Sequence, residues 1–194
     1  MTTGNDLIEQ SKAEFGILLH KEPEKLEALL KRALTEFQAR AGVLQSVELL
    51  PEQADDNGYY DLPEFYAGLV VCEGSTGSIV DAKVVSVPDD NGGTVGKIKI
   101  AGAPAWGPYT FRYHMNLRNV PLDRELPVEC VPIVGSLLSK MIDLPNTQRL
   151  RQVRQSEGLD TNDLESDQEL KQRITDALND IALRAQVLPM VMIG

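Results

Sequence analysis

Aromatic side chains make up only 5% of this 194-residue chain, and it contains just two cysteines, Cys72 and Cys130. With so few aromatic rings, a core has to be built mainly from Leu, Val, Ile and Ala. Two cysteines 58 positions apart offer no metal-ligand spacing. We expect both to be free thiols in a protein made in a reducing cytosol.

The chain also lacks an excess of basic charge, because 19 Lys and Arg stand against 29 Asp and Glu and give a net charge of -10. This charge argues against general adhesion to nucleic acid, which needs a cationic surface. It would suit a passage through which DNA slides without sticking. No apolar run approaches the roughly 20 residues that a membrane span needs, and the polar residues 1–6 do not resemble a signal peptide.

An apolar strip closes the sequence. Residues 187–194 read Val-Leu-Pro-Met-Val-Met-Ile-Gly and include no charged side chain. Exposing such residues costs free energy, because about 0.8 kcal/mol is gained for each CH₂ removed from water. The strip should therefore lie against its own core or another subunit. The interface residues predicted here are Leu188, Met190, Val191, Met192 and Ile193.

Helical periodicity marks both ends of the chain. A weak pattern covers residues 5–20, and a stronger one follows Pro23 and stops near Gly42. Residues 128–142 are apolar nearly all round, which predicts an interior helix with Pro132 in its first turn. Leu144-Pro145-Asn146 should end that helix, because a proline disfavours helix at the residue before it.

A basic helix should follow over residues 147–156, then an acidic loop over residues 157–169 with six carboxylates and no basic residue. Ser166 and Glu169 form a capping box for a last amphipathic helix that reaches residue 186.

The middle of the chain is rich in Gly, Val and Pro and reads as strands. Turns are expected at residues 74–77 and 103–105, and Asp89-Asp90-Asn91-Gly92-Gly93 gives a strong hairpin signal because its residues tolerate positive φ. The predicted strands cover residues 43–49, 67–72, 78–87, 93–101 and 108–117.

These patterns predict an α+β fold: a helical bundle with an inserted small antiparallel β-sheet and an extended C-terminal tail. The predicted parts are N-terminal bundle helices over residues 1–42, the β-rich insert over 43–118, C-terminal bundle helices over 119–186 and the tail over 187–194.

Few residues suggest catalysis. Residues 92–97 resemble a phosphate-binding loop, but Asn91 and Ile98 stand where that motif needs Gly and Ser or Thr. Cys72 and His114 could meet across the sheet as nucleophile and base, although a cysteine after Leu69-Val70-Val71 is more often a core residue. His20 is expected to be a solvated surface group.

Six carboxylates lie close together in the sequence and could include an acid and a base for glycoside hydrolysis, which needs two carboxyl groups in a cleft and one raised pKa. Clusters of this kind are expected in so acidic a chain and are usually solvated. We therefore expect no enzymatic activity, no cofactor and no metal site. The six are Glu52, Asp55, Asp56, Asp61, Glu64 and Glu73.

Two further features suggest interfaces. Trp106, the single tryptophan, is either a loop anchor or an interface anchor, since aromatic residues concentrate at binding hot spots. Arg149, Arg151 and Arg154 could hold DNA phosphates, but beside an acidic loop they are expected to pair with that loop or with a neighbouring subunit.

The organisation resembles the head-to-tail adaptor (head-completion or connector) proteins of tailed bacteriophages. The resemblance lies in the helical start, the β-rich insert, Leu62-Pro63-Glu64-Phe65 and the final helix-break-helix, and it is closest over residues 126–185. It implies a ring, usually of twelve copies, beneath the portal, with helices packed on the portal and on each other. The C-terminal strip of each copy would reach into the portal, and the β-rich insert would face proteins of the phage tail or neck. DNA would pass through the middle of the ring.

We therefore expect a non-enzymatic virion protein of the neck, made in the host cytoplasm. Two alternatives stay open: a cell-wall hydrolase that uses paired carboxylates, and another tail or baseplate structural protein.

Overall fold

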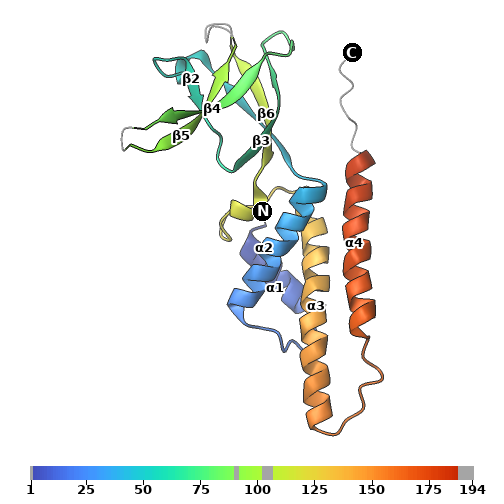
Figure 1. Cartoon of the computed structure of the whole chain (residues 1–194). Coiled ribbons are helices and arrows are strands. Elements are labelled where there is room, and N and C mark those ends of the chain that lie inside the picture. Colours follow the sequence, from blue (N-terminus) through green and yellow to red (C-terminus); the bar gives the residue numbers. More distant parts are fainter. Residues whose placement is uncertain (1, 90–91, 102–106, 188–194) are drawn as a thin grey trace. The chain divides into compact units, whose positions relative to one another are not determined.

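The computed structural model describes residues 2–89, 92–101 and 107–187, and Figure 1 traces the elements within each part of the chain. The chain divides into two compact units: a helical unit formed by Met1–Val43 with Leu117–Gly194, and a sheet unit formed by Leu44–Asn116. The predicted α+β class is confirmed, since the described residues form four α-helices and two three-stranded antiparallel sheets.

The helical unit begins with α1 (Gly4–Ala13) and α2 (Pro23–Arg40). Thr3 caps α1 in a capping box with Asp6, and Pro23 occupies the first turn of α2 as the sequence predicts. Gly42 follows α2 with φ at 69°, a conformation that suits glycine at a helix end. The first helix is shorter than the predicted 5–20. Residues 14–22 form a loop, and backbone groups in it are hydrogen-bonded to side chains of the helix over residues 131–156.

The long helix α3 (Val131–Ser156) is the centre of this unit. Its inner face carries apolar side chains at helical spacing, and α1, α2 and α4 (Asp167–Val187) all pack against it. The fully buried side chains of this core are Leu26, Leu30, Leu34, Val134, Leu137, Leu138, Ile142 and Leu170, with Leu117 beside them.

The predicted break at Leu144-Pro145-Asn146 is wrong, because α3 runs through Pro145 without ending. An interior proline removes one helix hydrogen bond and costs about 3 kcal/mol. Buried residues lie on both sides of it, Met141 and Ile142 before and Asn146 and Thr147 after. Packing of both segments outweighs the local preference to stop.

The sheet unit contains two sheets where the sequence predicts one. The first has the order β1 (Leu44–Leu49), β6 (Tyr109–Met115), β3 (Tyr66–Glu73). The second has the order β2 (Tyr59–Asp61), β5 (Thr94–Ile100), β4 (Ala82–Pro88). Sequence analysis misses β2, since three residues are too few to show an alternating pattern.

The core of the sheet unit is separate from that of the helical unit. Phe111 and Ile98 have no exposed surface and Tyr60 only 1%, and these three side chains lie in one apolar cluster drawn from both sheets. Alternation along β6 buries Tyr109, Phe111 and Tyr113 and leaves His114 exposed.

Two of the predicted turns can be checked. Antiparallel pairing of β4 with β5 confirms the hairpin, in which the amide of Asp89 donates to the carbonyl of Gly93 at 3.0 Å. The turn at residues 74–77 is confirmed by the bond from the Gly77 amide to the Gly74 carbonyl, 2.9 Å. The turn predicted at 103–105 lies outside the described residues.

Within the described ranges, none of the helices combines the length and apolar character that crossing a membrane requires.

Phe111→Ala is expected to lower the free energy of unfolding of the sheet unit by about 3–5 kcal/mol, the usual cost of emptying a buried Phe position. All five tyrosines belong to the sheet unit. In a urea titration, near-ultraviolet circular dichroism therefore reports that unit, whereas the signal at 222 nm reports the helices. We expect the first transition to move and the second to stay.

Val70→Ala, at a position 45% exposed on β3, is the matched control and should shift neither transition strongly. Loss of the helical signal together with the sheet signal in Phe111→Ala would show that the two cores are not separate.

Candidate functional site

The loop between α1 and α2 is bound to α3 by Asn146, a side chain only 5% exposed. Its amide oxygen accepts hydrogen bonds from the backbone of Leu19 at 2.6 Å and of His20 at 3.2 Å. Its amide nitrogen donates to the carbonyl of Ile17 at 2.9 Å. One side chain thus satisfies three backbone groups of a non-helical segment that would otherwise be partly buried without partners.

Arg149 continues this attachment one turn further along α3. Its guanidinium donates to the carbonyl of Leu19 at 2.7 Å and to both carboxylate oxygens of Glu22 at 2.9 and 2.6 Å. The fork geometry makes this a bidentate pair. The hydrogen bonds from Arg149 lower the pKa of Glu22 to about 2. Glu22 is also the residue before α2, so the pair fixes where that helix begins.

His20 is buried in this attachment, which corrects the expectation of a solvated surface group. It is 7% exposed, and its Nδ1 has no hydrogen-bond partner and lies 4.0 Å from Glu22 Oε2. Burial, and then the charge of Arg149, lower the pKa of His20. The sequence around His20 is polar and does not predict its burial, which depends on the hydrogen bond between its backbone and the distant Asn146.

The other two predicted arginines pair with the acidic loop, as expected. Arg151 Nη1 lies 2.7 Å from Asp167 Oδ1, and Arg154 Nη1 lies 2.6 Å from Asp163 Oδ1. Hydrogen bonds from the arginines lower the pKa of both aspartates. These pairs tie α3 to the segment that leads into α4. An interface role for Arg149, Arg151 and Arg154 stays a prediction, now for side chains already paired within the chain.

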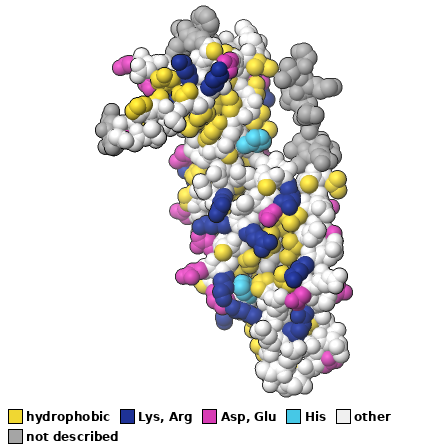
Figure 2. Space-filling model, in the orientation of Figure 1, with side chains coloured by type: hydrophobic (Ala, Val, Ile, Leu, Met, Phe, Trp, Pro, Cys, Tyr) yellow, Lys and Arg dark blue, Asp and Glu magenta, His cyan; other side chains and the backbone are white. Residues whose placement is uncertain are grey.

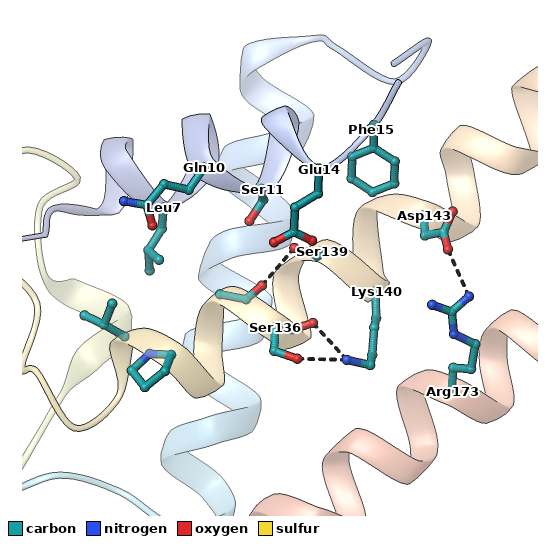
Figure 3. Close-up of a pocket in the computed structure, with 13 residues that line it drawn as sticks. Leu7, Gln10, Ser11, Glu14, Phe15, Ser136, Ser139, Lys140, Asp143 and Arg173 are labelled. Atoms are coloured by element: carbon teal, nitrogen blue, oxygen red, sulfur yellow. Dashed lines mark hydrogen bonds and ion pairs between the residues drawn. The ribbon is translucent and has the colours of Figure 1, made fainter. Parts of the chain in front are cut away.

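A first groove, of about 590 Å³, lies between α1, α3 and α4 (Figure 3). Gly135 permits α1 to approach here, because a Cβ at that position would lie 3.3 Å from Leu7. The walls are largely polar. Lys140 Nζ donates to Ser136 Oγ at 2.8 Å, and Arg173 Nη1 of α4 lies 3.3 Å from Asp143 Oδ2 of α3.

A second groove, of about 440 Å³, lies between α3 and α4 and shares Pro132, Ser136, Lys140 and Arg173 with the lining of the first. We call it the α3/α4 groove. On the face of the helical unit that Figure 2 shows, hydrophobic side chains reach the surface with Lys, Arg, Asp and Glu side chains around them. The groove has an apolar floor of Ile133, Leu137, Ala177 and Ile181 and an α4 rim of Arg173, Asp176, Asp180 and Arg184. Leu137 and Ile181 are themselves buried, so the accessible part of the floor comes from the partly exposed Ile133 and Ala177.

The groove is open because few side chains of α4 are buried against the rest of the chain. Among the side chains of α4 that the structure describes, only Leu170 and Ile181 are buried, and Leu183 is 60% exposed. The sequence shows the apolar stripe of this helix, but a stripe does not reveal how much of it the same chain covers.

Other predicted interface residues cannot be placed. Trp106 and the strip residues Leu188, Met190, Val191, Met192 and Ile193 lie outside the described residues, and Val187 is the last residue of α4.

The nucleophile-and-base pair suggested by the sequence does not form. Buried Cys72 lies opposite Phe111 in the β3–β6 ladder, whereas exposed His114 lies opposite Gly68. Burial raises the pKa of Cys72 to about 11, so its thiol is not activated.

The carboxylates of the sheet unit are partly neutralised. Lys97 Nζ lies between Asp61 Oδ1 at 2.7 Å and Asp55 Oδ2 at 3.6 Å, and Arg112 pairs with Glu73 at 3.1 Å. The pKa of Asp55 is lowered, first by a hydrogen bond from the backbone of Tyr59. A general acid needs the opposite shift. In the part of the chain that the structure describes, no three His, Cys, Asp or Glu side chains are placed to hold a metal ion.

Neither a protein-family model nor a curated protein sequence matches this chain.

Asn146→Ala is expected to destabilise the helical unit by about 2–3 kcal/mol, because backbone groups of the loop lose their partners while staying largely buried. Urea unfolding followed at 222 nm measures the change, and hydrogen exchange should speed up at Leu19 and His20. Asn179→Ala on the exposed face of α4 is the control and should change neither quantity. Equal effects of the two variants would contradict the role given to Asn146.

The stability of the helical unit should fall with acidification in two steps. The lowered pKa of His20 means that the unfolded chain takes up its proton first, so stability is lost as pH falls below about 6.5. The Glu22 pair is lost as pH falls from 4.5 towards 2. Thermal unfolding across pH 3–8 measures both.

His20→Gln should remove the upper step, and His114→Gln, at an exposed position on β6, should leave it in place. An upper step that survives in His20→Gln would assign it to another group.

Proposed function

We propose that this protein is a structural component of a virion, forming a ring that joins the portal to the tail and continues the DNA channel. The observation that carries the proposal is the α3/α4 hairpin, whose outer helix is thinly buried and borders an open groove with an apolar floor. A helix with so little of its surface covered gains much of its stability only when another surface packs on it.

The arrangement of the chain supports an adaptor. A helical unit is interrupted by a sheet unit and followed by the apolar strip. Such a chain can present its helices to one neighbour and its sheets to another. We assign the helical unit to the portal side of the ring, and the sheet unit to tail or neck proteins.

A ring suits the weak contacts that each copy offers. Each subunit would add a modest interface, and closure of a cyclic assembly makes the copies hold one another in place. The resemblance to bacteriophage adaptors suggests twelve copies.

The charge supports a channel for DNA. Residues 44–116 hold ten Asp and Glu against four Lys and Arg, a net charge of -6 out of -10 for the chain. A surface of this sign repels phosphates, so DNA would pass without being held. The arginines of α3 already have carboxylate partners.

Native mass spectrometry with portal rings of the same virus tests the proposal. We expect the portal ring to gain the mass of a complete ring of this protein, twelve copies if the usual number holds. Portal rings that gain no mass at any ratio of the two proteins would overturn it. Bovine serum albumin, similarly acidic, serves as the control for non-specific attachment.

Removal of residues 188–194 should leave a folded protein that no longer joins portal rings, because the strip residues would find their pocket only in the assembly. Circular dichroism checks the fold, and the same mass measurement checks assembly. Normal assembly of the shortened protein would show that the strip has no such role.

A further inference from the structure

We propose that the α3/α4 groove of one copy receives residues 188–194 of a second copy, an inference that rests on the ring proposed above and names the contact that closes it. The groove and the strip have matching chemistry, because apolar side chains line the one and an uncharged apolar sequence makes up the other.

The chemistry of the two surfaces is complementary. In the floor of the groove Ile133 and Ala177 are partly exposed beside the buried Leu137 and Ile181, and the strip offers Leu, Met, Val and Ile side chains with no charge. Arg173, Asp176, Asp180 and Arg184 form a rim around this floor. An apolar centre with a polar rim is the usual anatomy of a protein interface.

The lengths also match. From Pro132 to Lys140 the α3 wall runs about 12 Å, and from Arg173 to Arg184 the α4 wall runs about 17 Å, at 1.5 Å for each residue of helix. A segment of seven residues spans up to about 23 Å when extended. It can therefore fill the groove and keep a residue or two to reach it. Pro189 disfavours helix at Leu188, so the sequence favours an extended segment.

The position of the groove favours a second copy over the same chain. Arg184 lines the end of the groove, and α4 ends three residues later at Val187. Because α4 is itself one wall and ends beyond Arg184, its last turn points out of that end of the groove. To enter its own groove the strip would have to reverse at once, which uses up residues needed to fill it. A neighbouring copy needs no reversal.

Crosslinking of two variants, each with one added cysteine, tests the contact. Met192→Cys places a thiol on the strip, and Ala177→Cys places one on the groove floor. Both native cysteines are buried, and burial raises the pKa of Cys72 to about 11 and of Cys130 to about 12, so they should not compete. The two variants are mixed, treated with a short bis-maleimide, and separated on a denaturing gel with differently tagged chains.

We expect a heterodimer of the two variants at roughly tenfold the yield obtained when Thr175→Cys replaces Ala177→Cys. Thr175 is exposed on α4 and does not line the groove. Equal yields would overturn the inference. So would a double variant, Met192→Cys with Ala177→Cys in one chain, that crosslinks only within itself, or a strip thiol that crosslinks to the portal alone.

Ala177→Arg provides a second test that does not depend on crosslinking. A large charged side chain on the partly exposed floor should block the groove, so the folded variant should form no ring, whereas Thr175→Arg should assemble like the unaltered protein. If Ala177→Arg forms rings on the portal, the inference fails and the proposed function stands. If the unaltered protein never binds the portal, the proposed function fails. The crosslinking yield between copies still decides whether the strip occupies the groove.

Discussion

The attachment of the α1–α2 loop to α3 by Asn146 and Arg149 is the constraint on which the helical unit depends. The loop carries no regular structure, and these two side chains provide hydrogen-bond partners for backbone groups of Ile17, Leu19 and His20. By fixing the loop they set where α1 ends and α2 begins, and hence how both helices lie on α3. The groove beside α1 then follows from that placement. Arg149 follows Asn146 by three positions, about one helical turn, so a single turn of α3 holds the loop that joins α1 to α2.

The hold on α4 is of a different kind. It comes from ion pairs near the surface, those of Arg151, Arg154 and Arg173, and from a narrow apolar contact. Exposed ion pairs contribute little free energy but restrict geometry. The outcome is a helix that is positioned but thinly covered, which leaves an open apolar floor between α3 and α4. This contrast between a firmly bound loop and an exposed helix is the basis on which we propose assembly.

Much of the fold could be predicted from the sequence because it depends on local patterns: the spacing of Leu in α2, the capping box at Ser166 and Glu169, and the hairpin near Gly92 and Gly93. The continuity of α3 through Pro145 could not, since it depends on burial on both sides of the proline. The burial of His20 depends on Asn146, 126 positions away. Of the candidate site, the pairing of Arg151 and Arg154 with the acidic loop was predictable from charge. The partner of Arg149 and the groove itself arise only when distant segments meet.

Electron cryomicroscopy of intact virus particles tests the central claim most directly, because it would show whether this protein is present and where it lies. The proposal predicts a closed ring of density directly beneath the portal, with the α3/α4 hairpin at its portal side and each groove occupied by an extended segment from the adjacent copy. Density for this chain at the tip of the tail, or its absence from the particle, would contradict that claim.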